Sequence, residues 1–453
     1  MKKFKRVAIG LAIALVLPVA QAADGETAPK AGREALFEDD AAASPALGSG
    51  VKFAGFAELE LAYTTPQPGH WSRMLTRAQL DATGAFNQNV KWKLSGRVDY
   101  DAVYDLTDFY SPEVAHDARF GLYARENYLD ISASDWDVRL GRQQVVWGEM
   151  VGLFFADVVS ARDLREFILP DFHIIRIPQW AARVEYFKDD LHAELLWIPV
   201  PSYDKIGVPG AQFFPAPPPA PPGFGEEIRN EQFPDRTLSN TNYGLRLSAL
   251  RGGWDVSAFY YGSLDAQPTF FREIVADPQP TFIYQARHER INQFGATLAK
   301  DFGSAVLKAE TVYTRGRQYA VENLTDPDGV VPQNTLEWVV GLEFPLSVAD
   351  ARLNLQFFQG IFLNYDSQIF PDKYENGYSV LLSGKLADRL EAQVLWISSL
   401  NRTDWMARPR VSWDMRKNWR LAFGVDVFDG PPLGLFGRFS DSDRVYADLL
   451  YSF

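Results

Sequence analysis

Charged side chains recur at every second position in several short segments of this sequence. In one segment Arg97 and Asp99 alternate with apolar residues, and in another Arg408 and Arg410 do the same. Side chains two positions apart on a β-strand point to the same face. The chemistry of such a face is electrostatic, because charges along a wall attract or exclude solutes without making or breaking bonds.

Side chains that could carry out catalysis or hold a metal ion form no recognisable pattern. The five histidines are scattered, there is no H-E-x-x-H or G-x-S-x-G motif, and the absence of cysteine rules out a thiol nucleophile. The net charge of −13 and the lack of a basic stripe argue against nucleic acid as a partner. We therefore predict no catalytic residue, no metal site, no cofactor and no enzymatic activity.

The first 22 residues have the features of a secretory signal peptide. Four cations within residues 2–6 precede an apolar run from Val7 to Val19, and Ala20-Gln21-Ala22 provides an A-x-A cleavage site. The apolar run is too short for a membrane-spanning helix. Residues 1–22 are therefore predicted to direct export, and residues 23–50, rich in alanine and acids, to form a periplasmic tail.

The last residues of the chain alternate as a membrane-facing strand would. Val445, Ala447, Leu449, Tyr451 and Phe453 are apolar at every second position. This is the pattern of a closing strand of an outer-membrane barrel, with one face toward lipid. We expect Tyr451 and Phe453 to be the signal that the barrel-assembly machinery recognises.

Short and long connections alternate along residues 51–453. The short ones are turns of Asn, Asp and Gly type at 86–89, 132–135, 188–190, 251–253, 300–303, 345–350, 386–388 and 415–418. The longer ones lie at 64–72, 104–120, 145–179, 200–238, 265–281, 316–333, 364–375, 399–404 and 429–442. This alternation predicts an all-β fold, a transmembrane antiparallel up-and-down β-barrel of about 18 strands with its short turns in the periplasm. We expect it in the bacterial outer membrane, with its apolar face against lipid and with Arg97, Arg139, Arg183, Arg408 and Arg410 in the lumen.

Residues 146–179 differ from an ordinary extracellular loop because they are rich in apolar side chains. So much apolar surface is expected to be buried, and the available space is the barrel interior. We predict an infolded constriction loop with a short helix around Asp157–Leu169 that ends at Pro170. The alternatives are an outward cap on neighbouring loops or a surface patch that binds a partner.

Nine residues in and before this loop are candidates for its attachment or its lining. Arg142, Trp147 and Glu149 are expected to fix the loop, with Trp147 packed into the lumen and Glu149 paired with an arginine, since a buried carboxylate needs such a partner. The expected lining of the remaining opening is Asp157, Arg162, Asp163, Arg165, Glu166 and His173.

The loop at 200–238 contains a proline-rich stretch. Residues 213–224 read FFPAPPPAPPGF, and repeated proline imposes an extended conformation without ladder hydrogen bonds. The segment is expected to be extracellular, either a semi-rigid lid that grips apolar solutes through its phenylalanines or a stiff, exposed loop.

The run from Arg139 to Glu149, RLGRQQVVWGE, is followed by a proline-bounded apolar loop and by the strand Arg183–Phe187. In these residues the chain resembles a large group of uncharacterised proteobacterial outer-membrane proteins, known by a domain-of-unknown-function label. The resemblance implies a porin-like barrel. It also implies an association with hydrophobic or lipid-like compounds, sometimes beside an inner-membrane lipid transporter.

These features predict a channel or transport barrel for small, hydrophobic or amphipathic molecules, gated by the loop at 146–179. A second hypothesis is an outer-membrane component of a lipid transport system with periplasmic or inner-membrane partners. A third is a structural or adhesin-like barrel whose loops bind. An open lumen, an apolar groove and a sealed lumen would distinguish the three.

Overall fold

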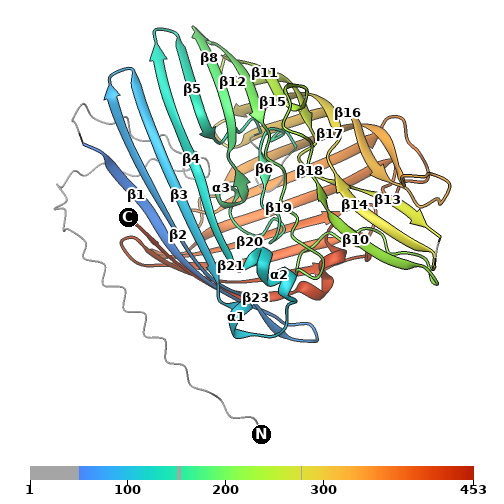
Figure 1. The fold of residues 1–453 in the computed structure, drawn as a ribbon. Coiled ribbons are helices and arrows are strands. Elements are labelled where there is room, and N and C mark those ends of the chain that lie inside the picture. Colours follow the sequence, from blue (N-terminus) through green and yellow to red (C-terminus); the bar gives the residue numbers. More distant parts are fainter. Residues whose placement is uncertain (1–49, 149, 151–154, 277) are drawn as a thin grey trace. The chain divides into compact units, whose positions relative to one another are not determined.

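The computed structural model describes residues 50–453, apart from 149, 151–154 and 277 (Figure 1). The predicted signal peptide, 1–22, and all but the last residue of the predicted tail, 23–50, lie outside the described residues. Eighteen antiparallel strands form one sheet, in which consecutive barrel strands pair with each other. The last strand pairs with the first and closes the barrel, so the predicted fold class is confirmed.

The barrel strands are β1 (Lys52–Thr64), β2 (His70–Asn87), β3 (Val90–Asp101), β4 (Phe120–Ala133), β5 (Trp136–Gln143), β8 (Gln179–Lys188), β9 (Leu191–Val200), β11 (Asn242–Arg251), β12 (Trp254–Leu264), β15 (Arg290–Asp301), β16 (Val306–Ala320), β17 (Val330–Pro345), β18 (Arg352–Phe362), β19 (Tyr374–Ala387), β20 (Leu390–Ser399), β21 (Trp405–Arg416), β22 (Trp419–Asp429) and β23 (Arg444–Ser452). The predicted short turns all fall between consecutive strands at one end of the barrel. The long connections join strands at the other end, which is the extracellular end in barrels of this type.

The connections at the extracellular end contain their own small elements. These are α1 (Val103–Leu106), α2 (Pro112–Ala118), β6 (Ala161–Arg162), α3 (Phe172–Ile175), β7 (Arg176–Ile177), β10 (Gly225–Gln232), β13 (Thr269–Val275), β14 (Thr281–Arg287) and two 3-10 turns, Leu238–Asn240 and Gly437–Ser442. Strands β10, β14 and β13 form a separate three-stranded sheet. Among the described residues, no helix is long and apolar enough to cross a membrane.

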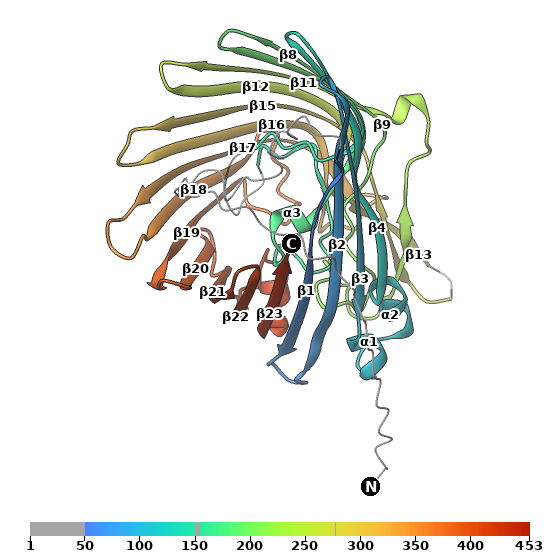
Figure 2. The ribbon, with the colours of Figure 1, turned by 90° about the vertical axis from the view of Figure 1, so that its left-hand side faces the viewer.

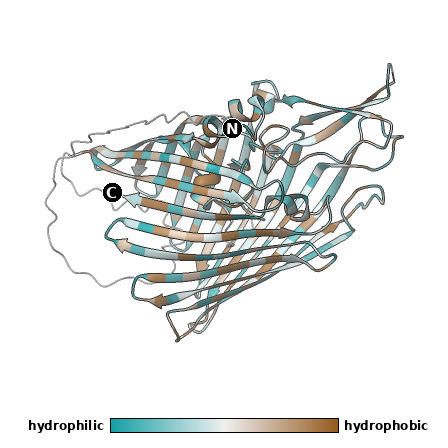
Figure 3. Cartoon of the chain, turned by 90° about the horizontal axis from the view of Figure 1, so that it is seen from below, coloured by the Kyte–Doolittle hydropathy of each residue, from teal (hydrophilic) through white to brown (hydrophobic). Residues whose placement is uncertain are grey.

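The two faces of the barrel wall differ as the period of two predicts. On β3, Lys93, Arg97 and Asp99 are buried, whereas Leu94 and Val98 between them are exposed. Figure 3 shows the same alternation of hydrophilic and hydrophobic residues along other strands. The charged set therefore faces the lumen, and the apolar set faces outward to lipid.

One strand appears irregular in sequence because it contains a β-bulge. Arg125 and Leu129 of β4 have the same parity, yet Arg125 is 5% exposed and Leu129 is 40% exposed. The register shifts between Leu94 and Gly96 of β3, so that two residues of β4 stand opposite one. The side chain of Asn127 fills the bulge by bonding the N–H and C=O of Ser95. A bulge moves every following side chain to the other face.

Aromatic residues mark the periplasmic edge of the wall and the barrel seam. Trp136, Trp254 and Trp419 are each the first residue of a strand that follows a short turn, as expected of an interfacial belt. The backbone of Phe453 exchanges two 3.0 Å hydrogen bonds with Gly55, at the seam between the chain ends. The role of Tyr451 and Phe453 as an assembly signal stays a prediction.

The helix predicted at Asp157–Leu169 is wrong. Residues 161–162 instead form β6, which pairs with β7. Phe167 has φ of +51°, a left-handed conformation that no helix accommodates. The short helix α3 begins two residues after Pro170, so the proline precedes a helix rather than ending one. Strand pairing gives residues 161–162 hydrogen-bond partners from outside their own segment, which the apolar pattern alone does not reveal.

Because the outer wall faces lipid, we predict that a charge introduced there lowers the stability of the barrel by an amount that depends on its depth in the membrane. We expect Leu94→Arg, in the middle of β3, to lower the free energy of unfolding by about 2–4 kcal/mol, because the guanidinium would enter the hydrocarbon region. Phe86→Arg, at the periplasmic turn, is the control and should cost at most about 1 kcal/mol. Urea unfolding in lipid vesicles measures both, and equal costs would contradict the assignment.

Candidate functional site

The segment between β5 and β8, residues 144–178, folds into the barrel and is called the constriction loop below. In both ribbon views α3 lies within the ring of strands (Figures 1 and 2). Its apolar side chains Val145, Trp147, Ala156 and Val159 belong to one buried cluster with wall residues of β8, β9, β12 and β16. The apolar surface of this segment is thus buried against the inside of the wall.

Trp147 is the anchor at the start of the constriction loop. Its side chain is 1% exposed, and its Nε1–H donates to Oε1 of Glu194 on β9 at 3.0 Å. The indole packs against Phe259, with ring centroids 5.2 Å apart. Gly244 leaves room for it, since a Cβ there would lie 2.5 Å from the indole. The structure places Trp147 in the lumen wall, as the sequence suggested.

A single wall carboxylate holds the next part of the constriction loop. Oε1 of Glu310 on β16 accepts from the N–H of Met150 at 2.9 Å, and Oε2 accepts from the N–H of Ala156 at 3.0 Å. Gly148 lies close to this site, because a Cβ there would lie 3.3 Å from Oε1 of Glu310 and 2.7 Å from the Asp157 nitrogen. Glu149, the carboxylate predicted to pair with a wall arginine, lies outside the described residues.

Wall arginines bind the carbonyl groups of the rest of the loop. Arg125 on β4 donates to the C=O of His173 at 2.6 Å and of Arg176 at 2.9 Å. Arg97 on β3 donates to the C=O of Ile174 at 3.1 Å, and Arg408 on β21 donates to that of Leu169 at 2.7 Å. These strands lie on different sides of the barrel, so the loop is attached across the lumen.

Glu166 anchors the constriction loop to the wall through ion pairs. Its carboxylate lies 2.8 Å from Arg73 of β2 and 2.8 Å from Arg444 of β23, on either side of the seam strand β1. Arg444 also pairs with Asp426 at 2.9 Å, and Arg408 pairs with the same Asp426 at 2.8 Å. Glu166, predicted to line the opening, instead completes a buried ion-pair network.

The other predicted lining residues mostly stabilise the loop itself. Asp157 is buried and pairs with Arg176 at 3.0 Å, while Arg162 donates to the Asp157 carbonyl at 2.7 Å. Asp163 pairs with Arg165 at 2.7 Å. Burial opposes ionisation of Asp163, but Arg165 and other nearby cations outweigh it and hold the pKa of this carboxyl well below its usual range. His173 exposes its side chain and is the one of the six best placed to line an opening.

The prediction that Arg142 fixes the constriction loop from the lumen is wrong. The strand register places Arg142 opposite Trp180, which is 46% exposed, and Leu140 on the same strand is also exposed. Gln143, the next residue, is fully buried and bonds the Ala181 carbonyl. Arg142 therefore points to the outer face, because Gly141 and Gln143 take the inward positions.

Of the remaining predicted lumen arginines, Arg139 and Arg183 pair with carboxylates of the wall. Arg139 lies 2.7 Å from Asp130, and the guanidinium of Arg410 reaches Asp171 of the constriction loop only at 3.9 Å. Arg183 lies 2.7 Å from Glu185 and 3.3 Å from Glu194. These charged side chains of the described lumen wall thus form ion pairs, and charges of one sign are not grouped together.

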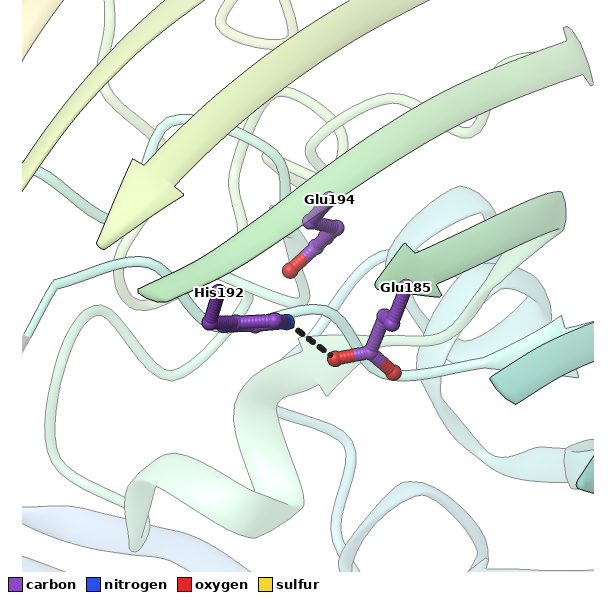
Figure 4. Close-up of side chains that lie close together, drawn as sticks. All are labelled: Glu185, His192 and Glu194. Carbon is purple, nitrogen blue, oxygen red and sulfur yellow. Dashed lines mark hydrogen bonds and ion pairs between the residues drawn. The ribbon is translucent and has the colours of Figure 1, made fainter. Parts of the chain in front are cut away.

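Glu185, His192 and Glu194 bring three potential metal ligands together on β8 and β9 (Figure 4). The His192 ring is stacked on Phe187 and lies 2.9 Å from Glu185, as the dashed line shows. The Arg183 guanidinium contacts both carboxylates and supplies the positive charge that a metal ion would bring. The contacts therefore favour an ion-pair cluster over a metal centre.

The proline-rich loop covers the extracellular mouth. Phe213 is 1% exposed and packs with Phe428, Phe436 and Phe439, while Phe167 of the constriction loop joins the same cluster. The Gln212 side chain accepts hydrogen bonds from His70 and Tyr110. Phe213 is therefore buried rather than exposed, and the role of this stretch as a lid that grips solutes stays a prediction.

Residues 202–205 connect the proline-rich loop to the constriction loop. Oδ1 of Asp204 accepts from the N–H of Arg162 at 2.6 Å, and the N–H of Lys205 donates to the Arg162 carbonyl at 2.8 Å. Burial raises the pKa of the Asp204 carboxyl to about 6, although Arg162 opposes the shift. The two loops therefore form one hydrogen-bonded layer inside the mouth.

The family model described as a protein of unknown function (DUF1302) matches residues 70–453. The chain belongs to this family. No curated protein matches the sequence of this chain.

Among solved structures, this DUF1302 protein is similar to OccAB1 of Acinetobacter baumannii, with a TM-score of 0.55, 8% identity, and coverage of 91% of this chain and 99% of that one. It is also similar to OccK8 (OprE) of Pseudomonas aeruginosa, with a TM-score of 0.51, 8% identity, and coverage of 89% and 97%. At these identities the likeness concerns the fold, which is that of outer-membrane porin-like barrels. The sequence motif and the link to lipids stay predictions.

From the ion pairs of Glu166 we predict that neutralising this carboxylate loosens the constriction loop. Glu166→Gln should lower the free energy of unfolding by about 2–3 kcal/mol, because Arg73 and Arg444 each lose one buried counter-charge and keep only Glu60 and Asp426. Hydrogen exchange of residues 161–176 should rise severalfold. Asp171→Asn on the same loop is the control, since its side chain is 65% exposed. Unchanged hydrogen exchange in Glu166→Gln would show that the ion pairs of Glu166 do not hold the loop.

The raised pKa of Asp204 predicts a pH-dependent stability. The native state holds a proton that the unfolded chain releases near pH 4, so this stability is present at low pH and is lost as the pH rises through about 6. Asp204→Asn, which stays neutral, should raise the free energy of unfolding at pH 7.5 by about 3 kcal/mol and change it little at pH 4. Urea unfolding at the two pH values measures this. Asp108→Asn, an exposed control, should show no such difference.

Proposed function

We propose that this DUF1302 protein is an outer-membrane channel through which small, hydrophobic or amphipathic solutes diffuse, restricted by the constriction loop. The observation that carries the proposal is a closed 18-stranded barrel whose interior is crossed by a wall-anchored loop. Barrels of 16 to 18 strands are wide enough for an aqueous channel unless something narrows them. A loop fixed at Glu310, Arg125, Arg408 and Glu166 supplies that narrowing.

The composition of the mouth supports an amphipathic rather than a strongly charged solute. The loops that meet there pack on one another and on Phe428 of β22 through Phe167, Phe213 and Phe439. The wall charges nearest the loop are paired, which leaves little unbalanced charge to select one sign of ion. Selectivity then rests on the width left beside the loop, because Phe213, Phe428 and Phe439 are buried against one another.

Single-channel conductance in a planar bilayer tests this function. We expect the refolded protein to give a steady, ohmic current that rises severalfold when residues 150–176 are replaced by a short Gly-Ser linker, because the lumen then has its full width. A matched shortening of the extracellular loop at 323–328 should leave the current unchanged.

The same recordings can refute the channel. A folded protein that passes no current, with or without residues 150–176, would be a sealed barrel. Equal currents before and after the replacement would show that the constriction loop does not restrict the pore.

A further inference from the structure

A cavity of about 290 Å³ lies at the extracellular end of β9, outside the ion-pair network. It is bounded by the segment after β9, with Pro199, Pro201 and Tyr203, and by residues 233–240, with Phe233, Arg236 and Asn240. Its volume is near the lower end of the range for small-molecule sites, and its walls combine apolar rings with a few polar groups. Such a lining suits a small molecule with a flat apolar body and one polar end.

The apolar wall of the cavity is fixed in place before any ligand arrives. The Tyr203 ring packs on His288 with centroids 4.1 Å apart, and the Phe233 ring is stacked on the same imidazole at 5.8 Å. The His288 side chain is fully buried, held at 2.8 Å by the Asp265 carbonyl and at 2.7 Å by Glu231. Rings held in this way lose little conformational freedom when a ligand binds.

The polar end of the cavity carries an available cation. Within the described part of the chain, Arg236 makes no hydrogen bond or ion pair, and it is exposed to solvent. Asp235 also borders the cavity, but Asn240 donates to its backbone carbonyl at 2.9 Å and orders this turn. A second guanidinium, that of Arg290, is fixed close by through the carbonyls of Ser239 and Thr241. Arg290 already donates to these carbonyls, so the guanidinium of Arg236 is the one that lines the cavity and can bind a negatively charged ligand.

The inner wall of the cavity is the same segment that holds the constriction loop. Ser202 donates its N–H to the Gln179 side chain at 2.8 Å, and Asp204 and Lys205 bond to Arg162. A molecule held against Tyr203 therefore lies against the segment that is hydrogen-bonded to the constriction loop. This placement suits an extracellular capture site.

We propose that this cavity binds a small amphipathic anion, with its flat apolar body on Tyr203 and Phe233 and its negative group at Arg236. The biological meaning of the site, capture of a solute before passage, rests on the proposed channel function. Binding itself does not, and it can be measured separately.

Calorimetric titration of the whole protein in nanodiscs, with empty nanodiscs as the blank, tests the site. The probe is 3-phenylpropionate, compared with 3-phenylpropan-1-ol and 3-phenylpropylamine, which share its shape but are neutral or positive. We expect saturable 1:1 binding that is tightest for the carboxylate. Arg236→Gln should weaken it roughly tenfold or more, the loss expected when a charge-assisted hydrogen bond is removed. Arg119→Gln, an exposed arginine on another loop, is the matched control.

A second variant tests the apolar wall, and the conductance of the same preparations separates the two proposals. Tyr203→Ala with Phe233→Ala should abolish binding in a protein whose electrophoretic mobility still shifts on heating, as a folded barrel's does. Tightest binding of the amine would assign the polar end to Asp235 and overturn the proposal. No binding of any probe to a protein that conducts would refute the cavity site alone. Binding without conductance would refute the channel alone.

Discussion

The structure depends on satisfying the backbone of a loop that runs through the barrel interior. A buried N–H or C=O group without a partner is costly, and an irregular loop cannot pair its own groups as a strand does. Here the inward-facing charged side chains provide the partners. Glu310 accepts from loop N–H groups, and Arg97, Arg125 and Arg408 donate to loop carbonyls. The charges of the wall are therefore structural before they are selective.

The same requirement explains why the lumen contains charges of both signs. Each arginine that binds a loop carbonyl also needs a counter-charge once it is removed from water. Asp426 is the counter-charge of Arg408 and Arg444. Glu166 of the loop is a counter-charge of Arg444 and Arg73. Glu60 of β1 pairs with Arg73 at 2.8 Å, so the network joins the first and last strands of the barrel to the loop. Barrel closure and loop attachment thus depend on shared residues.

Two loops that differ from ordinary barrel connections form the entrance together. The constriction loop and the proline-rich loop meet through the Arg162, Asp204 and Lys205 hydrogen bonds and through the aromatic cluster around Phe213. Their contact makes the mouth a single layer. A solute that reaches the cavity at Tyr203 lies against this layer rather than in open lumen, which connects the proposed binding site with the proposed channel.

The sequence by itself determined the barrel, its 18 strands, the position of its turns and the existence of an apolar loop, because a period of two and the composition of turns are local properties. Tertiary structure decided the rest. The face of Arg125 depends on a bulge opposite Ser95, and that of Arg142 on its register with Trp180. The helix at Phe172–Ile175 and the pairing of β6 with β7 depend on contacts between segments. Likewise, nothing near Glu166 in the sequence indicates Arg73 or Arg444, since barrel closure brings together residues from opposite ends of the chain.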